Sequence, residues 1–221
     1  MKALKIGALM LGITVAVPVA AQMDMTEIVK KVSKARQENA QKTRDYSWTQ
    51  RTEVKVKGEV KNLKSEIVRY TVDGELQKTP IDETSAKAPK GVRGKVAKKK
   101  IGEMKDWMAD LSELLKAYSL PTEGNLLDFL NEASVTPDGD GRRLEASDIV
   151  QPGDRMSVWI GADHKMTKTE VSTQHDGADV KLETDHGTTP DGLDYVARTM
   201  IVVPDKGVEM TVENFSYQKE R

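Results

Sequence analysis

The sequence predicts an α+β protein, in which about three helices cover the inner face of one large, curved antiparallel sheet of about nine or more strands. Segments with alternating apolar residues, separated by tight-turn signals, fill most of the chain from Asp45 onward. Helical spacing occurs only before that point and within residues 101–133. Because an apolar sheet face needs a cover and few helices are available, we expect one covered face and one face in water.

Residues 1–21 have the features of a secretory signal peptide. Lys2 and Lys5 precede an apolar run that ends with Val19 and Ala21, small residues at the −3 and −1 positions of a cleavage site. A membrane anchor is the alternative, but the run is shorter than the roughly 20 residues that span a bilayer. We therefore expect export with cleavage after Ala21.

Composition limits the classes of protein. The absence of cysteine excludes disulfides, thiolate metal sites, a cysteine nucleophile and a lipid-modified cysteine behind the signal peptide. The formal net charge of −1 becomes −3 without Lys2 and Lys5, so total charge gives no argument for nucleic acid. We expect a single unanchored domain over residues 22–221, in a bacterial periplasm or, alternatively, secreted into the medium.

The first part of the mature chain is expected to hold one helix and three strands. Met25 to Thr43 carries apolar residues at helical spacing. Asp45 to Glu59 alternates instead, and we expect its charged side to face water while its apolar side (Tyr46, Trp48, Val54 and Val56) faces the core. A turn at Gly58 and a hairpin signal at Asp73-Gly74 place the next strands at Val60–Val72 and Glu75–Ile81.

A basic segment and a helical insertion follow. Almost no apolar residue occurs from Asp82 to Lys100, so we expect a basic loop over residues 84–100. From residue 101 the spacing is helical up to Pro121, and Thr122 can cap a second, short helix. The insertion thus covers residues 101–133.

The remainder is expected to form a meander of short strands. Turn signals such as Pro137 to Gly141, Gln151 to Asp154 and Pro204 to Gly207 separate its alternating segments. The residues that share a face within a segment are Met156, Val158 and Ile160; Ala178, Val180 and Leu182; Leu193, Tyr195, Ala197, Thr199, Ile201 and Val203; and Val208, Met210 and Val212.

This order of elements resembles the periplasmic lipoprotein-carrier superfamily. The first strand has an aromatic-x-aromatic-x-Gln pattern at Tyr46, Trp48 and Gln50, and "GVEMTVENFSYQK" at Gly207–Lys219 is similar to the last strand of such proteins. The resemblance implies an unclosed half-barrel with helices as a lid over an apolar cavity. The type member carries acyl chains of lipoproteins between membranes. Because the fold also serves envelope-stress sensing and one biosynthetic enzyme, no functional residue is transferred.

An apolar cavity is the first candidate site, and its methionines would suit flexible chains. The alternative is that the same residues simply form the core. The candidates are Trp48, Val54, Val56, Met104, Trp107, Met108, Leu111, Val158, Tyr195, Ile201 and Met210.

A surface that meets anionic head groups or an acidic partner is the second candidate, with a solvated loop as the alternative. Its residues are Lys90, Arg93, Lys95, Lys98, Lys99 and Lys100.

Catalytic and metal sites have little support in the sequence. His164, His175 and His186 each adjoin an aspartate, but successive turns of a meander lie at opposite ends of the sheet, which disfavours a three-histidine site. No nucleophile or nucleotide motif occurs. We therefore expect a non-enzymatic carrier of a lipid or acylated ligand, which could also contact a membrane surface or an envelope protein, without cofactor, metal or nucleic acid. The alternative is an envelope protein-interaction or sensing module with a filled core.

Overall fold

The computed structural model describes residues 25–85, 92–120 and 122–220, and the expected signal peptide lies outside them. These residues form one antiparallel sheet of ten strands in the order β3-β2-β1-β10-β9-β8-β7-β6-β5-β4. The helices are α1 (Met25–Thr43), α2 (Val92–Ala117) and α3 (Glu123–Glu132), with a 3-10 turn η1 (Pro204–Lys206). The strands are β1 (Tyr46–Val56), β2 (Glu59–Tyr70), β3 (Leu76–Ser85), β4 (Ser134–Asp138), β5 (Gly141–Ser147), β6 (Arg155–Ile160), β7 (Met166–His175), β8 (Ala178–Thr188), β9 (Asp194–Val203) and β10 (Val208–Lys219).

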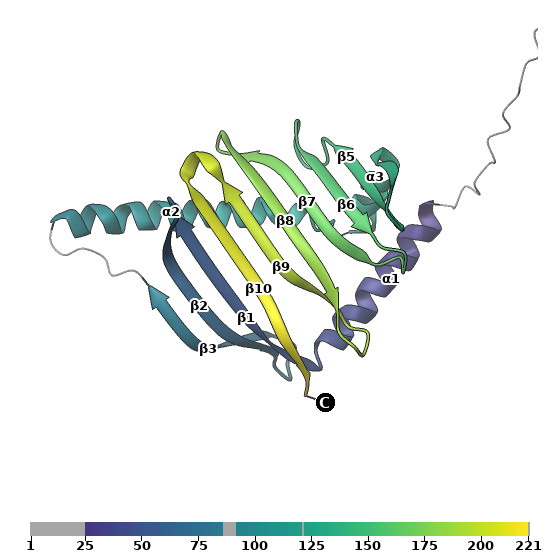
Figure 1. Cartoon of the computed structure of the whole chain (residues 1–221), viewed down its shortest axis with the longest axis horizontal. Helices are drawn as coiled ribbons and strands as arrows, with labels where there is room; N and C mark the ends of the chain where they lie inside the picture. Colours follow the sequence, from purple (N-terminus) through teal and green to yellow (C-terminus); the bar gives the residue numbers. More distant parts are fainter. Residues whose placement is uncertain (1–24, 86–91, 121, 221) are drawn as a thin grey trace, which may run out of the picture.

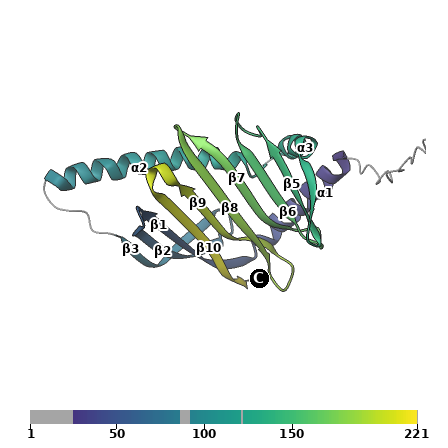
Figure 2. The same cartoon turned by 45° about the horizontal axis from the view of Figure 1, so that its top comes forward.

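The predicted fold class is confirmed. The sheet is curved and stays open, with β3 and β4 as its two free edges, and the three helices lie on the same side of it (Figures 1 and 2). The chain enters the sheet at β1 and ends in β10, which pairs with β1 in the middle of the strand order. First and last strands therefore meet, and this brings residues from both ends of the described chain together.

The two faces of the sheet differ as the alternation in β1 predicts. On the covered face, Val56 pairs with Val208 and Val54 with Met210 across the β1–β10 ladder. On the opposite face, a shallow depression is lined by charged and polar residues of β1, β9 and β10. These residues are Arg51, Glu53, Lys55, Arg198, Thr211 and Glu213. The charged side of β1 thus faces water, while the apolar side faces the helices.

Two apolar clusters fill the covered face. The first joins α1 and α3 to β5, β6 and β7, with Val29, Phe129, Leu144 and Val171 at its centre. Thr122 caps α3 by accepting the amide of Asn125 at 3.1 Å, which fixes the start of that helix against the cluster. The second cluster lies under α2, between Leu111 and the strands β8 to β10. The helices thus cover the sheet from β5 to β10, whereas β2 and β3 carry exposed apolar residues such as Ile67 and Ile81.

The basic loop expected over residues 84–100 is wrong in its extent. β3 continues through residues 84 and 85, and α2 begins at Val92, so residues 92–100 form the first turns of a helix. Lysine, arginine and alanine are good helix formers, and the packed part of α2 propagates the helix into them despite the unfavourable dipole interaction. Residues 86–91 lie outside the described part. The structure also contains β4, where Pro137 and Gly139 predict a turn alone.

Within the described residues, no helix is both long and apolar enough to span a bilayer.

Candidate functional site

The apolar face of α2 gathers most of the predicted cavity residues. Leu111 is fully buried against β8, β9 and β10, and Met104, Trp107 and Met108 flank it on the same face of the helix. Across from them lie Val56, Ile201 and Met210. We call this group the α2 site, and its members are Val56, Met104, Trp107, Met108, Leu111, Ile201 and Met210.

α2 is anchored to the rest of the fold just beyond its C-terminal end. Tyr118 donates a hydrogen bond of 2.7 Å to the buried carboxylate of Asp154, and its oxygen lies 2.8 Å from the hydroxyl of Thr173. Arg36 of α1 donates to the carbonyl of Leu120 at 2.9 Å. The side chains of α2 that are described and face the sheet make apolar and aromatic contacts with it, and the Trp107 ring also lies against the ammonium of Lys206. This part of the helix body therefore rests on the sheet mainly through contacts that are not directional.

Trp107 marks the rim of the α2 site. Its ring lies 5.0 Å from the ring of His175 at the β7–β8 turn, and the ammonium of Lys206 in η1 lies 4.6 Å from its centroid. The Nε1 of Trp107 and the Nε2 of His175 are both buried and have no hydrogen-bond partner among the described residues. A buried donor or acceptor without a hydrogen bond costs about 1–3 kcal/mol of stability. The packing of α2 against the sheet therefore leaves two nitrogen atoms at this rim without a hydrogen bond.

Four predicted cavity residues lie outside the α2 site. Val158 belongs to the cluster under α1 and α3. Val54 pairs with Met210 but is only half-buried. Trp48 and Tyr195 join an aromatic group at the far end of β1, β9 and β10, centred on Tyr217.

A polar belt across β1, β2 and β10 separates the aromatic group from the α2 site. Gln50 donates to Asn214 at 3.0 Å and accepts from Lys78 at 2.7 Å. Next to it, Glu66 is 7% exposed and forms an ion pair of 2.7 Å with Lys64. Hydrogen-bonded polar groups at this depth interrupt the apolar face, which explains why the predicted cavity residues divide into separate groups.

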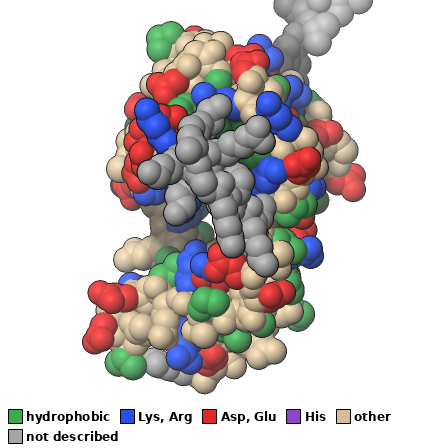
Figure 3. All heavy atoms as spheres, turned by 90° about the vertical axis from the view of Figure 1, so that its left-hand side faces the viewer, with side chains coloured by type: hydrophobic (Ala, Val, Ile, Leu, Met, Phe, Trp, Pro, Cys, Tyr) green, Lys and Arg blue, Asp and Glu red, His purple; other side chains and the backbone are tan. Residues whose placement is uncertain are grey.

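The predicted basic surface is only partly described. Lys90 lies outside the described residues, and Arg93, Lys95, Lys98 and Lys100 are placed in α2 by their backbone alone. Lys99 is exposed and lies 3.8 Å from Glu103, one turn further along the helix. Figure 3 faces this end of the molecule and shows Lys and Arg side chains interspersed with Asp and Glu side chains on the visible surface.

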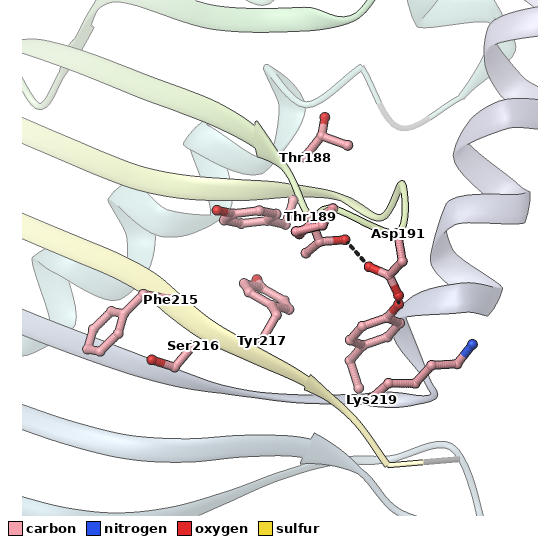
Figure 4. A pocket seen from close by; sticks show the side chains of 10 residues that line it. Thr188, Thr189, Asp191, Phe215, Ser216, Tyr217 and Lys219 are labelled. Atoms are coloured by element: carbon pink, nitrogen blue, oxygen red, sulfur yellow. Dashed lines mark hydrogen bonds between the residues drawn. The ribbon is translucent and has the colours of Figure 1, made fainter.

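A pocket of about 300 Å³ lies where β9 and β10 separate, and the sequence analysis did not identify it. The β9–β10 ladder ends at the pair Arg198–Glu213, beyond which β9 pairs only with β8 and β10 only with β1. Register shifts in the two neighbouring ladders lie at the same level, and such bulges bend strands apart. We call this the β9–β10 pocket (Figure 4); its lining residues are Tyr46, Thr188, Thr189, Pro190, Asp191, Tyr195, Phe215, Ser216, Tyr217 and Lys219.

One end of the β9–β10 pocket is polar and ordered by hydrogen bonds. Asp191 accepts from the hydroxyl of Thr189 at 2.6 Å and from the hydroxyl of Tyr46 (Figure 4). These two bonds lower the pKa of Asp191, and the positive charge of Lys219 adds to the effect. Asp191 is therefore ionised at neutral pH. The same hydrogen bond raises the pKa of Tyr46, so this phenol keeps its proton.

The other part of the pocket is aromatic. Tyr217 stacks on Trp48 with ring centroids 5.4 Å apart and touches Tyr195 at 4.4 Å. Burial, followed by the neighbouring tyrosines, raises the pKa of Tyr217 well above its ordinary value. Strict alternation along β10 would place Tyr217 on the side opposite to Met210, but the bulge at Ser216 sets Ser216 and Tyr217 together opposite Trp48. No local sequence pattern predicts that bulge.

Metal-binding groups do not converge in the described part of the chain, which holds no cluster of three or more histidine, aspartate or glutamate residues suited to an ion.

No family model and no curated protein sequence matches the chain. Solved structures do match over most of their length. A DUF1329 family protein from Desulfovibrio piger is 11% identical over 90% of this chain and 94% of its own, with a TM-score of 0.38. A LolA superfamily protein from Nitrosomonas europaea is 9% identical over 82% and 92%, with a TM-score of 0.36. A domain from Vibrio parahaemolyticus, named for outer membrane lipoprotein sorting, is 10% identical over 87% and 92%, with a TM-score of 0.40.

Solved structures from the superfamily that the sequence resembles are thus among the matches. At TM-scores of 0.36 to 0.40, the likeness is a loose one of arrangement and says nothing about which residues of this chain bind a ligand.

Proposed function

We propose that the protein is a non-catalytic periplasmic carrier that holds an apolar or acylated ligand in the α2 site. The observation that carries the proposal is the way α2 is attached. Its far end is anchored through Tyr118, while the described side chains of its body that face the sheet are apolar and aromatic. Such contacts are not directional, so the helix can lift and settle again on a chain-like ligand without breaking specific bonds.

The composition of the α2 site supports a flexible apolar ligand. Met104, Met108 and Met210 converge there, and unbranched thioether side chains adapt to variable shapes. The nitrogens of Trp107 and His175, which lack a hydrogen bond although His175 Nε2 lies 3.9 Å from the Asp176 carboxylate, add a reason for opening, because a ligand oxygen or water admitted at the rim could bond to them. The polar belt at Gln50 and Glu66 limits how far an alkyl chain can extend along the sheet.

Native mass spectrometry tests this function. The mature chain is purified from a periplasm without detergent, its mass is measured under native conditions, and the sample is then extracted with organic solvent. We expect a near-stoichiometric lipid or lipopeptide. A clean apo mass in several preparations, together with failure to take up added fatty acid, would contradict the proposal.

A protein-interaction module is the second candidate function, and the edge strand β3 favours it. Leu76 and Ile81 are 48% and 57% exposed, and β3 offers a free edge to which another strand could pair. Replacing Ile81 by lysine puts a charge on this exposed edge without removing a backbone donor from β3. If β3 is an interface, this change reduces capture of an envelope partner in a pull-down; equal capture by both proteins would contradict it.

A further inference from the structure

The β9–β10 pocket has a chemistry different from that of the α2 site. It combines aromatic rings with hydroxyl groups and a pair of opposite charges, and it shares no residue with the α2 site. Its volume of about 300 Å³ is at the lower end of the range for small-molecule sites. The pocket therefore suits one small polar unit rather than an extended chain.

Three hydroxyl groups in the pocket are free to bind. The side chains of Tyr195, Ser216 and Tyr217 have no hydrogen-bond partner within the described residues, and all three are at least partly open to solvent. A ligand that enters the pocket can therefore replace the water that these hydroxyls bond. Because a hydroxyl both donates and accepts, the group fits a ligand that itself carries several hydroxyls.

The charges in the pocket oppose each other. Asp191 is ionised, and Lys219 lies close enough to lower the pKa of its carboxyl group. An anionic ligand would meet Asp191, and a cationic one would meet Lys219, so each net charge is disfavoured. A neutral ligand can accept from Lys219 and donate to Asp191 without that conflict.

Other neutral or cationic ligands fit less well. An acyl chain would bury the three hydroxyls without partners, at a cost in free energy. A quaternary ammonium group needs open ring faces around it, but Tyr217 is stacked on Trp48 and in contact with Tyr195. Phe215 is 43% exposed and its ring points away from Tyr217 and Asp191 (Figure 4), so it adds apolar surface only at the outer edge of the pocket, where the apolar face of a flat ligand can lie. A pyranose ring has one such face and hydroxyls around its edge.

We propose that the β9–β10 pocket binds a neutral saccharide unit, with Tyr195, Tyr217 and Asp191 bonded to its hydroxyls. The protein would then recognise a glycan at a site separate from any ligand held under α2.

Saturation-transfer NMR with the mature chain tests the proposal. The probes are maltotriose, cellotriose and chitotriose at millimolar concentration, with a sulfated and an amino-substituted oligosaccharide for comparison. We expect at least one neutral trisaccharide to bind and to change the fluorescence of Trp48 through its stacking on Tyr217. Tyr217→Phe and Tyr195→Phe should each weaken that binding about three- to tenfold, the effect of one lost hydrogen bond.

Tyr70→Phe is the matched control. Tyr70 also lies near Trp48, with ring centroids 6.2 Å apart, but it does not line the pocket. Its removal should leave saccharide affinity unchanged. The inference fails if no neutral trisaccharide binds, if only a charged oligosaccharide binds, or if both pocket variants bind as well as the parent protein while keeping its circular dichroism spectrum.

Discussion

The side chain of Asn39 bonds to both backbone groups of Asp194. Its Nδ2 donates to the Asp194 carbonyl at 2.7 Å, and its Oδ1 accepts the Asp194 amide at 2.9 Å. Asp194 is the first residue of β9, at the level where β10 has moved away. Asn39 of α1 therefore takes the place of a strand partner and fastens the helix to the separated end of β9.

We predict that Asn39→Ala lowers the free energy of unfolding by about 1–2 kcal/mol, because two backbone groups lose their partner. Urea denaturation followed by circular dichroism measures the change. Gln41→Ala, on an exposed position of the same helix, is the control and should have little effect. Equal stability of the two variants would show that water replaces Asn39 at no cost.

Asp154 makes the stability of the fold depend on pH in the acidic range. Its carboxylate is 2% exposed and accepts the amides of Ile149, Val150 and Gln151 as well as the hydroxyl of Tyr118. Burial alone would raise the pKa of Asp154, but these hydrogen bonds outweigh it and lower the pKa below the ordinary value of 3.8. The carboxylate thus contributes stability above pH 3.8 that is lost as pH falls through its lowered pKa.

We predict that Asp154→Asn destabilises the protein at neutral pH by about 1–3 kcal/mol and also flattens the loss of stability below pH 4. Chemical denaturation at several pH values measures both effects. Some acid dependence should remain, because the pKa values of Asp191 and Asp194 are lowered as well. Asp110→Asn on the exposed side of α2 is the control; an unchanged slope in the Asp154 variant would refute the assignment.

Two glycines differ in what a methyl group would meet. At Gly141 an added Cβ would lie 2.2 Å from the carbonyl oxygen of Ile160, which is backbone and cannot turn away. At Gly187 it would lie 2.9 Å from the ring end of Tyr195, which can move. We predict that Gly141→Ala costs about 2–3 kcal/mol of stability and Gly187→Ala less than about 1 kcal/mol. Because Gly187→Ala displaces Tyr195, it should also weaken saccharide binding, which a binding titration with the trisaccharide measures. A Gly187→Ala variant less stable than Gly141→Ala would contradict the prediction.

The sheet class, α1 and the apolar part of α2 were predictable because they rest on local periodicity, whereas the basic start of α2 lacks that periodicity and was not. The bounds Met25–Thr43 expected for α1 agree with the structure, and the turns at Gly58 and Gly74 separate β1, β2 and β3 as expected. Alternation also predicted which side of β1 faces water. These features depend only on neighbours in the sequence and on the need to bury an apolar face.

The candidate sites were less predictable because they depend on register. Trp48 and Val56 share a parity in β1, yet the polar belt around Gln50 places them in different clusters. Ser216 adopts a left-handed backbone conformation with a φ of 55°. The resulting bulge turns the side chain of Tyr217 to the face opposite to the one that strict alternation predicts. The separation of β9 from β10, which creates the pocket, arises from ladders between distant segments. No window of the sequence contains that information.

Ser216 itself can be tested. A non-glycine residue with positive φ is strained, and a β-branched residue more so. We predict that Ser216→Gly leaves stability unchanged or raises it by up to about 1 kcal/mol, while Ser216→Val lowers it by about 1–2 kcal/mol. Thermal unfolding measures the stability, and near-UV circular dichroism reports the Trp48–Tyr217 stack. If the valine variant keeps both, the bulge is not needed to hold Tyr217.

The apolar ligand site can be separated from a plain core by placing one negative charge on either side of α2. Met108 faces the sheet within the α2 site, whereas the neighbouring Ala109 is exposed. We predict that Met108→Glu reduces retention of lipid more than tenfold in native mass spectra, because the carboxylate would have to be buried beside an alkyl chain. Ala109→Glu adds the same charge and should retain lipid.

Val56→Glu, on the sheet side of the α2 site, should reduce lipid retention as Met108→Glu does. It should also stay folded, since α2 can lift to hydrate the charge. If Met108→Glu and Val56→Glu both unfold the protein while Ala109→Glu does not, these positions belong to a filled core, and α2 is a fixed element rather than a lid.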